Sequence, residues 1–240
     1  MATSIIKKIS AAVFLLSVVG LSLYLVTHRG NAAARLPLTA DIPKLHEALY
    51  SETFPDGMVR CHLCPNECNL PPGRYGACKA RKNIDGKLYS MVYGKIGAVH
   101  VDPIEKKPFF HVLPGSKAYS IATAGCNMRC LFCQNWELSQ SFPEQIPSRD
   151  MTPDEVVDEA VRSGSKSIAF TYNEPVINYE FMIDTAKIAR QKGVKTVVVS
   201  SGYIEEEPLR ELLKYIDAYK VDFKAFDERF YRKIDRKSVV

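Results

Sequence analysis

The chain has 240 residues, of which 46% are hydrophobic and 25% are charged, the proportions of an ordinary globular protein. Its net charge is +5, and its lysines and arginines are scattered, so charge neither demands nor excludes a nucleic-acid surface. The seven cysteines fall in two tight clusters, which favours metal ligands over a disulfide framework and indicates a reducing compartment.

Residues 1–30 contain the most hydrophobic segment. After Lys7 and Lys8, an uncharged apolar run at residues 9–27 is just long enough to cross a hydrocarbon core of roughly 30 Å. A secretory signal cleaved near residues 32–34 would look similar. We expect a single-pass membrane anchor and a cytoplasmic catalytic domain, because an oxidising destination would endanger metal-binding thiols. Residues 31–56 are expected to form a linker.

The next predicted unit, residues 57–112, begins with four cysteines in the spacing C-x2-C-x3-C-x9-C, interrupted by prolines and glycines. Four thiolates form a complete tetrahedral set, which suits structural zinc and equally suits an iron-sulfur cluster. Thiols without metal are a third interpretation. Alternation at residues 87–98 predicts a hairpin, and residues 102–108 are expected to form a loop. The four candidate ligands are Cys61, Cys64, Cys68 and Cys78.

From residue 113 to residue 240, strand-like and helix-like patterns alternate. Strands are predicted at residues 118–123, 167–172, 194–200 and 218–224, with helices at 152–163, 176–192 and 207–215. This order predicts an α/β fold of parallel βα units, a partial (β/α) barrel. Functional side chains are therefore expected at the carboxyl ends of the strands.

The loop after the first of these strands carries three cysteines in the spacing C-x3-C-x2-C: Cys126, Cys130 and Cys133. Three thiolates are one fewer than a closed zinc or iron-sulfur site normally has. No cysteine or histidine follows Cys133, so either an upstream residue is the fourth ligand or one metal position stays open for chemistry.

The loops after the other strands also carry polar side chains. Asn173 and Glu174 follow the second strand, and Ser201 follows the third. On the fourth strand, Asp222 and Lys224 share one face and would point together toward the barrel mouth. Each has a purely structural alternative: Asn173 as a helix cap, Ser201 in a tight turn, and Asp222 with Lys224 as an internal ion pair.

The three-cysteine loop, with Phe132 before its last cysteine, resembles the signature loop of radical S-adenosylmethionine (SAM) enzymes. Within that superfamily, residues 61–65, 89–95, 101–108, 114–116 and 133–137 are similar to the AmmeMemoRadiSam system radical SAM proteins, relatives of pyruvate formate-lyase-activating enzyme. The resemblance covers about residues 57–235.

This resemblance implies a [4Fe-4S] cluster held by the three cysteines, with SAM bound to the open iron. It implies reductive cleavage of SAM to methionine and a 5′-deoxyadenosyl radical, which abstracts hydrogen from an unknown substrate, with macromolecules among the candidates. A reductase or a flavodoxin- or ferredoxin-type protein would supply the electron. Asn173 and Glu174 would contact the SAM amino group, Ser201 the SAM or its ribose, and Lys224, in an Asp-x-Lys element with Asp222, the methionine carboxylate.

One departure from the family is large. A radical SAM core normally has six βα units, whereas this chain ends just after the fourth predicted strand, so we expect an incomplete, truncated core at residues 113–240. Two other functions remain open: a glycyl-radical enzyme activase, and a non-catalytic, membrane-tethered module that binds zinc or an iron-sulfur cluster. No catalytic residue is assigned.

Overall fold

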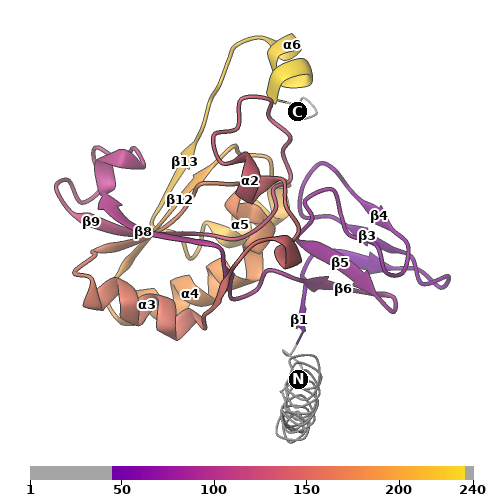
Figure 1. The fold of residues 1–240 in the computed structure, drawn as a ribbon, viewed down its shortest axis with the longest axis horizontal. Helices are drawn as coiled ribbons and strands as arrows, with labels where there is room; N and C mark the ends of the chain where they lie inside the picture. The colour runs from indigo at the N-terminus through magenta and orange to yellow at the C-terminus, as the bar shows by residue number, and fades with distance from the viewer. Residues whose placement is uncertain (1–44, 236–240) are drawn as a thin grey trace, which may run out of the picture. The chain divides into compact units, whose positions relative to one another are not determined.

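Short apolar strands alternate with helices in the second half of the chain and build one five-stranded sheet (Figure 1). The computed structural model describes residues 45–235. Four strands of this sheet run parallel, as the βα pattern predicts, and an antiparallel strand is added at one edge. In spatial order the strands are β13 (Ala218–Val221), β12 (Lys195–Ser200), β11 (Ser167–Phe170), β9 (Lys117–Ala122) and β8 (Ala98–Pro103).

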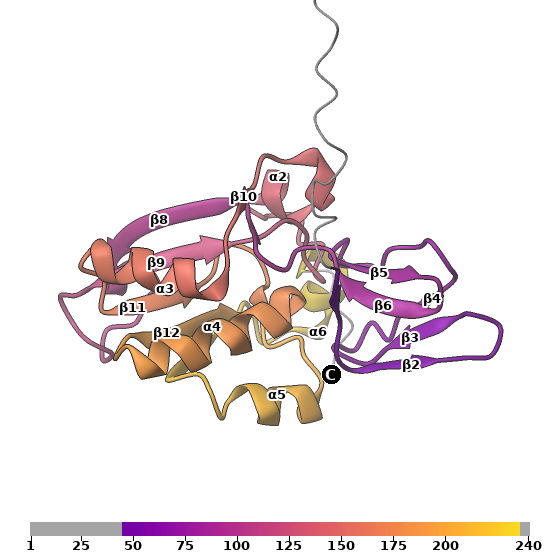
Figure 2. The same cartoon turned by 90° about the horizontal axis from the view of Figure 1, so that it is seen from below.

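Three helices connect the parallel strands: α3 (Pro153–Arg162), α4 (Tyr179–Gln191) and α5 (Glu206–Leu212). Helix α3 begins in a capping box, in which the backbone amide of Glu155 donates to the Thr152 hydroxyl at 3.2 Å. The helices lie along one side of the sheet (Figure 2). Their apolar residues pack against strand residues such as Ile168 and Val198, so the main core lies between helices and sheet.

The remaining strands are short and antiparallel. Strands β1 (His46–Glu47), β6 (Lys87–Ser90) and β5 (Arg81–Ile84) form one sheet, and β2 (Ser51–Thr53), β3 (Val59–Cys61) and β4 (Asn69–Leu70) form another. Strand β7 (Lys95–Ile96) pairs with β10 (Arg149–Asp150). The hairpin lies earlier than the pattern at residues 87–98 predicts, because Asp85 and Gly86, both with positive φ, make the turn between β5 and β6.

Several short helical segments complete the described chain. They are η1 (Ile104–Lys106), α2 (Trp136–Ser139), η2 (Pro143–Gln145), η3 (Pro175–Asn178), α6 (Glu228–Phe230) and η4 (Tyr231–Asp235). Across residues 45–235 the five-stranded sheet is not closed into a barrel, and β13 and β8 are its edges. The predicted α/β class is therefore confirmed, and the sheet is open.

The predicted membrane location requires correction. In the part of the chain that the structure describes, no helix has the length and apolar character needed to cross a bilayer. The single-pass anchor predicted for residues 1–30, and with it the expectation of a membrane-tethered protein with a cytoplasmic catalytic domain, is therefore withdrawn. The apolar run at residues 9–27 and most of the predicted linker lie outside the described residues.

Candidate functional site

The loops that follow the four parallel strands meet at one edge of the sheet and line a cavity of about 480 Å³. Parallel strands place their carboxyl ends together, which brings residues distant in sequence to one site. All eight residues that the sequence predicts at strand ends line this cavity. In chain order they are Cys126, Cys130, Cys133, Asn173, Glu174, Ser201, Asp222 and Lys224.

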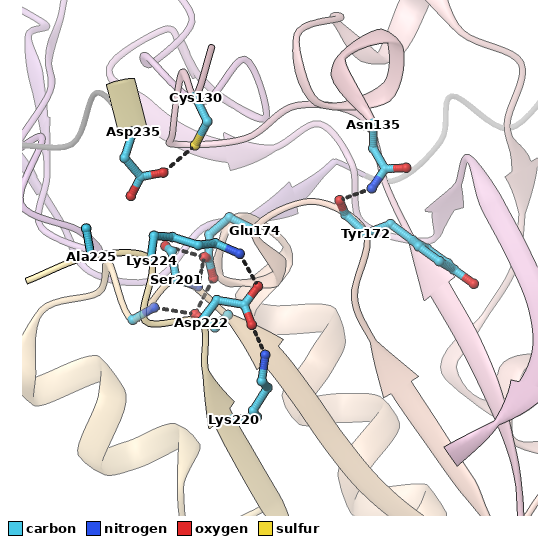
Figure 3. A network of polar contacts seen from close by, with 12 residues as sticks. Cys130, Asn135, Tyr172, Glu174, Ser201, Lys220, Asp222, Lys224, Ala225 and Asp235 are labelled. Carbon is cyan, nitrogen blue, oxygen red and sulfur yellow. Dashed lines mark hydrogen bonds and ion pairs between the residues drawn. The ribbon is translucent and has the colours of Figure 1, made fainter. Parts of the chain in front are cut away.

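The three cysteines of the first loop differ in exposure. Cys126 is buried, whereas Cys130 and Cys133 are partly exposed. The Cys130 thiol donates to a carboxylate oxygen of Asp235 at 2.8 Å (Figure 3), and the Cys133 sulfur lies 3.2 Å from the Ser139 hydroxyl. Burial, and after it the charge of Glu174, raises the pKa of Cys126 to about 12. A metal that binds this thiol must therefore displace its proton.

The thiols do not converge on a common point as they stand. Among residues 45–235, no three cysteine, histidine, aspartate or glutamate side chains are arranged to coordinate one ion. Cys130 and Cys133 are instead turned toward their hydrogen-bonding partners. A thiol is redirected by rotation about its single χ1 bond. Three sulfur donors on one loop that lines one cavity are the donor set of an iron-sulfur cluster, so these residues fit that group.

Glu174, at the end of β11, is 3% exposed and is held by the end of β12. Its carboxylate accepts from the Ser200 hydroxyl at 2.6 Å. It also accepts from the Ser201 hydroxyl and amide, at 2.6 and 2.7 Å (Figure 3). The backbone amide of Val176 also points to this carboxylate, at 3.4 Å. Burial raises the pKa of Glu174, and these donors offset part of that effect.

Asn173 ties the second loop to the first. Its side-chain amide donates to the carbonyl oxygens of Thr123 and Gly125, at 2.7 and 2.6 Å. These contacts position the chain immediately before Cys126. In the described contacts, Asn173 therefore has a structural function: it fixes the cysteine loop and does not cap a helix.

The predicted pair on the fourth strand is present. The Lys224 ammonium lies 2.8 Å from a carboxylate oxygen of Asp222, and both line the cavity (Figure 3). Lys220 forms a second ion pair with Asp222, which the sequence reasoning missed. The signal was available, because residues 220, 222 and 224 alternate onto one face of an extended chain. Burial, followed by repulsion from Lys224, lowers the pKa of Lys220.

A second missed group lies on the opposite wall, around Tyr172. This residue has φ of 74°, in the left-handed region that is unfavourable for an aromatic residue. Its hydroxyl donates to Asp102 at 3.0 Å, and the buried Lys107 ammonium lies 2.5 Å from the same carboxylate oxygen. The carbonyl of Tyr172 accepts from the Asn135 side chain at 2.7 Å (Figure 3). A buried ion pair thus holds the strained residue that precedes Asn173.

The four cysteines of the N-terminal cluster surround a separate, smaller cavity, formed by β3, the loop to β4 and the turn before β5. This small unit contacts the three-cysteine loop directly, because the backbone amide of Cys126 donates to the carbonyl of Cys78 at 3.0 Å. The two cysteine clusters are therefore separate in sequence and adjacent in space.

Comparison with known proteins agrees with this geometry. A family model described as the radical SAM superfamily matches residues 120–239. The chain is 47% identical to the uncharacterized protein MJ0808 of Methanocaldococcus jannaschii over 79% of its own length and 56% of that protein. It is 28% identical to a pyruvate formate-lyase-activating enzyme of Staphylococcus epidermidis, over 52% of this chain and 53% of that enzyme.

The chain is also 27% identical to the pyruvate formate-lyase-activating enzyme of Clostridium pasteurianum, over 47% of this chain and 48% of that enzyme. The chain thus spans about half the length of these curated relatives. The family match covers the parallel strands from within β9 onward, and with them the loops that carry the three cysteines, Glu174 and Lys224. The chain therefore belongs to the radical SAM superfamily and is similar within it to pyruvate formate-lyase-activating enzymes.

Proposed function

We propose that this chain forms the SAM-cleaving centre of a radical SAM enzyme that abstracts hydrogen from its substrate. The observation that carries the proposal is the arrangement around one cavity of three thiols, a buried glutamate and an ion-paired lysine, each from a different strand end. Cys126, Cys130 and Cys133 would hold a [4Fe-4S] cluster. When bound, that cluster supplies the electron for reductive cleavage of SAM to methionine and a 5′-deoxyadenosyl radical.

In this proposal the chain's own residues bind and orient SAM. Glu174 accepts a hydrogen bond from the SAM ammonium, and Lys224 donates to the methionine carboxylate. Asp222 keeps Lys224 directed into the cavity through the ion pair at 2.8 Å. Complementary charges placed at fixed points select one orientation of a zwitterionic ligand.

Glu174 can accept this hydrogen bond only if one of its present donors breaks its own bond to the carboxylate. An ionised carboxylate offers about four acceptor positions, and four donors already point to this one. The Ser201 hydroxyl is the donor suited to yield, because it can rotate while the Ser201 amide keeps its bond to the same oxygen. The Ser201 hydroxyl would thereby turn away from Glu174 when SAM binds, consistent with the predicted place of Ser201 beside SAM.

The test is anaerobic reconstitution of the full chain with iron and sulfide, followed by reduction with dithionite in the presence of SAM. We expect about four irons per chain and formation of 5′-deoxyadenosine, measured by liquid chromatography. Alanine at Cys126, Cys130 or Cys133 should abolish both the iron and the product. Leu131→Ala is the matched control, since Leu131 lies in the same loop and its side chain is 61% exposed. Protein that carries four irons and forms no 5′-deoxyadenosine would refute the proposal.

The names of two relatives favour a more specific role as an activating enzyme. Pyruvate formate-lyase-activating enzymes act, as their name says, on another enzyme. We therefore propose a protein substrate, a glycyl-radical enzyme being the candidate, and a flavodoxin- or ferredoxin-type electron donor. A glycyl-radical signal in electron paramagnetic resonance, formed on a candidate partner only with SAM and this chain, would support it. Bound iron without SAM cleavage would instead favour a non-catalytic metal-binding module.

A further inference from the structure

Four cysteines outside the SAM cavity line a pocket of their own. Cys61 ends β3, Cys64 and Cys68 lie in the loop to β4, and Cys78 lies in the turn before β5. All four are free thiols. Leu63, Leu70 and Ile177 close the pocket with apolar side chains, which shield it from water. No step of the proposed reaction uses these residues.

The fold brings the four sulfurs to one place. The sulfurs of Cys68 and Cys78 both lie 3.7 Å from the point where a Cβ on Gly76 would stand, so the missing side chain leaves space between them. The sulfur-bearing residues Cys61 and Cys64 line the same pocket as Cys68 and Cys78. Four cysteines around one pocket offer a single cation a complete set of thiolate ligands.

Hydrogen-bond donors already face these sulfurs. The backbone amide of Ala77 donates to the Cys68 sulfur at 3.4 Å, and the buried guanidinium of Arg81 donates to the Cys61 sulfur at 3.8 Å. Donors of this kind stabilise metal-bound thiolates, whose charge a single divalent ion does not fully neutralise. The pocket therefore provides both the ligands and their supporting contacts.

The size of the pocket accommodates a single ion. Its volume is about 20 Å³. One water-sized sphere needs about 10–15 Å³, so the space suits one small ion. Four thiolates in tetrahedral array are the ligand set of structural zinc.

We propose that Cys61, Cys64, Cys68 and Cys78 bind one zinc ion, and that this zinc site braces the loop beginning at Cys126. Zinc displaces the thiol protons to solvent, and no oxidation or reduction is involved. The thiols must first turn about χ1, since within residues 45–235 no three potential ligands stand at coordination geometry. The role of the site in holding the cysteine loop rests on the proposed function, whereas the binding of zinc does not.

Direct contacts connect the zinc module to the loop. The carbonyl of Cys78 accepts from the Cys126 amide at 3.0 Å. The Asn66 side chain, between two of the proposed zinc ligands, donates to the carbonyl of Asn127 at 3.0 Å. Displacement of either cysteine turn would thus move the backbone on which the first cluster ligand lies.

The zinc site is tested on the anaerobically purified full chain by metal quantification and zinc-edge X-ray absorption. We expect about one zinc per chain with four sulfur neighbours at about 2.3 Å. Cys61→Ser and Cys78→Ser should lose zinc. His62→Ala is the matched control and should keep it, because the His62 side chain is 36% exposed and faces Glu52 and Glu67 instead.

Absence of zinc, a nitrogen neighbour in the absorption spectrum, or about eight irons per reconstituted chain would overturn the zinc site. The absorption measurement uses the unmodified chain, so it decides even if the serine variants fail to fold. Zinc content is also independent of SAM cleavage, which separates failure here from failure of the proposed function.

The bracing is tested by hydrogen exchange before and after chelation of zinc. We expect the Cys126 amide, which donates to Cys78, to exchange at least about tenfold faster in the zinc-depleted chain. The amide of Val198 in the interior strand β12 is the internal control and should not change. Unchanged exchange at Cys126 would overturn the bracing role.

Discussion

Replacing Gly125 with alanine should disrupt the three-cysteine loop. Gly125 has φ of 87°, and a Cβ added there would stand 2.3 Å from the carbonyl oxygen of Cys78, the same oxygen that accepts from the Cys126 amide. The left-handed backbone costs an alanine about 1–2 kcal/mol. The steric overlap with a backbone atom adds about 1–3 kcal/mol, as overpacking of a close contact does. We expect a loss of about 2–5 kcal/mol in the free energy of unfolding.

Gly193→Ala separates the two contributions. Gly193 has φ of 70°, and nothing lies within 4 Å of its added Cβ, so only the backbone term applies. Urea unfolding followed by circular dichroism measures both variants, and the difference between them isolates the clash, about 1–3 kcal/mol. The Gly125 variant should also bind less iron on reconstitution, while the Gly193 variant should bind the normal amount. Equal losses of stability would refute the reasoning, because the contact with Cys78 would then carry no energy.

Three further predictions concern the ion pairs. Arg81 and Glu180 form a buried ion pair at 2.5 Å, so Arg81→Met or Glu180→Leu alone should cost about 3–5 kcal/mol, and the double variant should cost less than the sum of the two. A urea double-mutant cycle checks this, and additive losses would contradict it. Burial alone would raise the pKa of Asp102, but hydrogen bonds, of which that from Lys107 has the largest effect, hold this pKa well below its usual range. The ionised Asp102 carboxylate therefore stabilises the folded protein above about pH 4, and this stabilisation is lost as the pH falls. Asp102→Asn should therefore destabilise the protein more at pH 7 than at pH 3 in urea titrations; equal losses would argue against it. Lys224→Met should weaken SAM binding about 10- to 100-fold, because one charge-assisted hydrogen bond is lost, and it should leave the iron content unchanged. Anaerobic equilibrium dialysis measures the dissociation constant. An unchanged dissociation constant would show that Lys224 does not bind SAM.

The sequence patterns predict the parallel part of the fold, and the strand-end residues that they single out line one cavity. The spacing of apolar residues, and the glycines and prolines between apolar segments, locate the strands. Parallel βα units place the carboxyl ends of these strands at one edge of the sheet, which is why Cys126 and Lys224 line the same cavity. Distances between side chains do not follow from that rule. The hydrogen bonds from Ser200 and Ser201 to Glu174 depend on the parallel register of β11 and β12, which places their carboxyl ends side by side.

The antiparallel edge was the part that local patterns misjudged. Residues 102–108 carry two prolines and predict a loop, yet β8 continues to Pro103. A proline is tolerated there because β8 is an edge strand and Pro103 is its last residue. Since β8 was not expected to reach Asp102, the contact of that residue with Tyr172, 70 residues later, could not be anticipated either.

The three cysteines that we propose as cluster ligands differ in exposure and in the contacts of the chain around them. The chain before Cys126 is fixed on several sides: Gly125 donates to the carbonyl of Leu138 at 3.0 Å and accepts from Asn173, and Cys126 donates to Cys78. Cys130 and Cys133 are more exposed. A loop that is fixed at its first cysteine and more exposed at the other two can bring its thiols onto a cluster without moving the sheet. Preorganisation at Cys126 is therefore where support from the N-terminal cysteine module has the greatest effect.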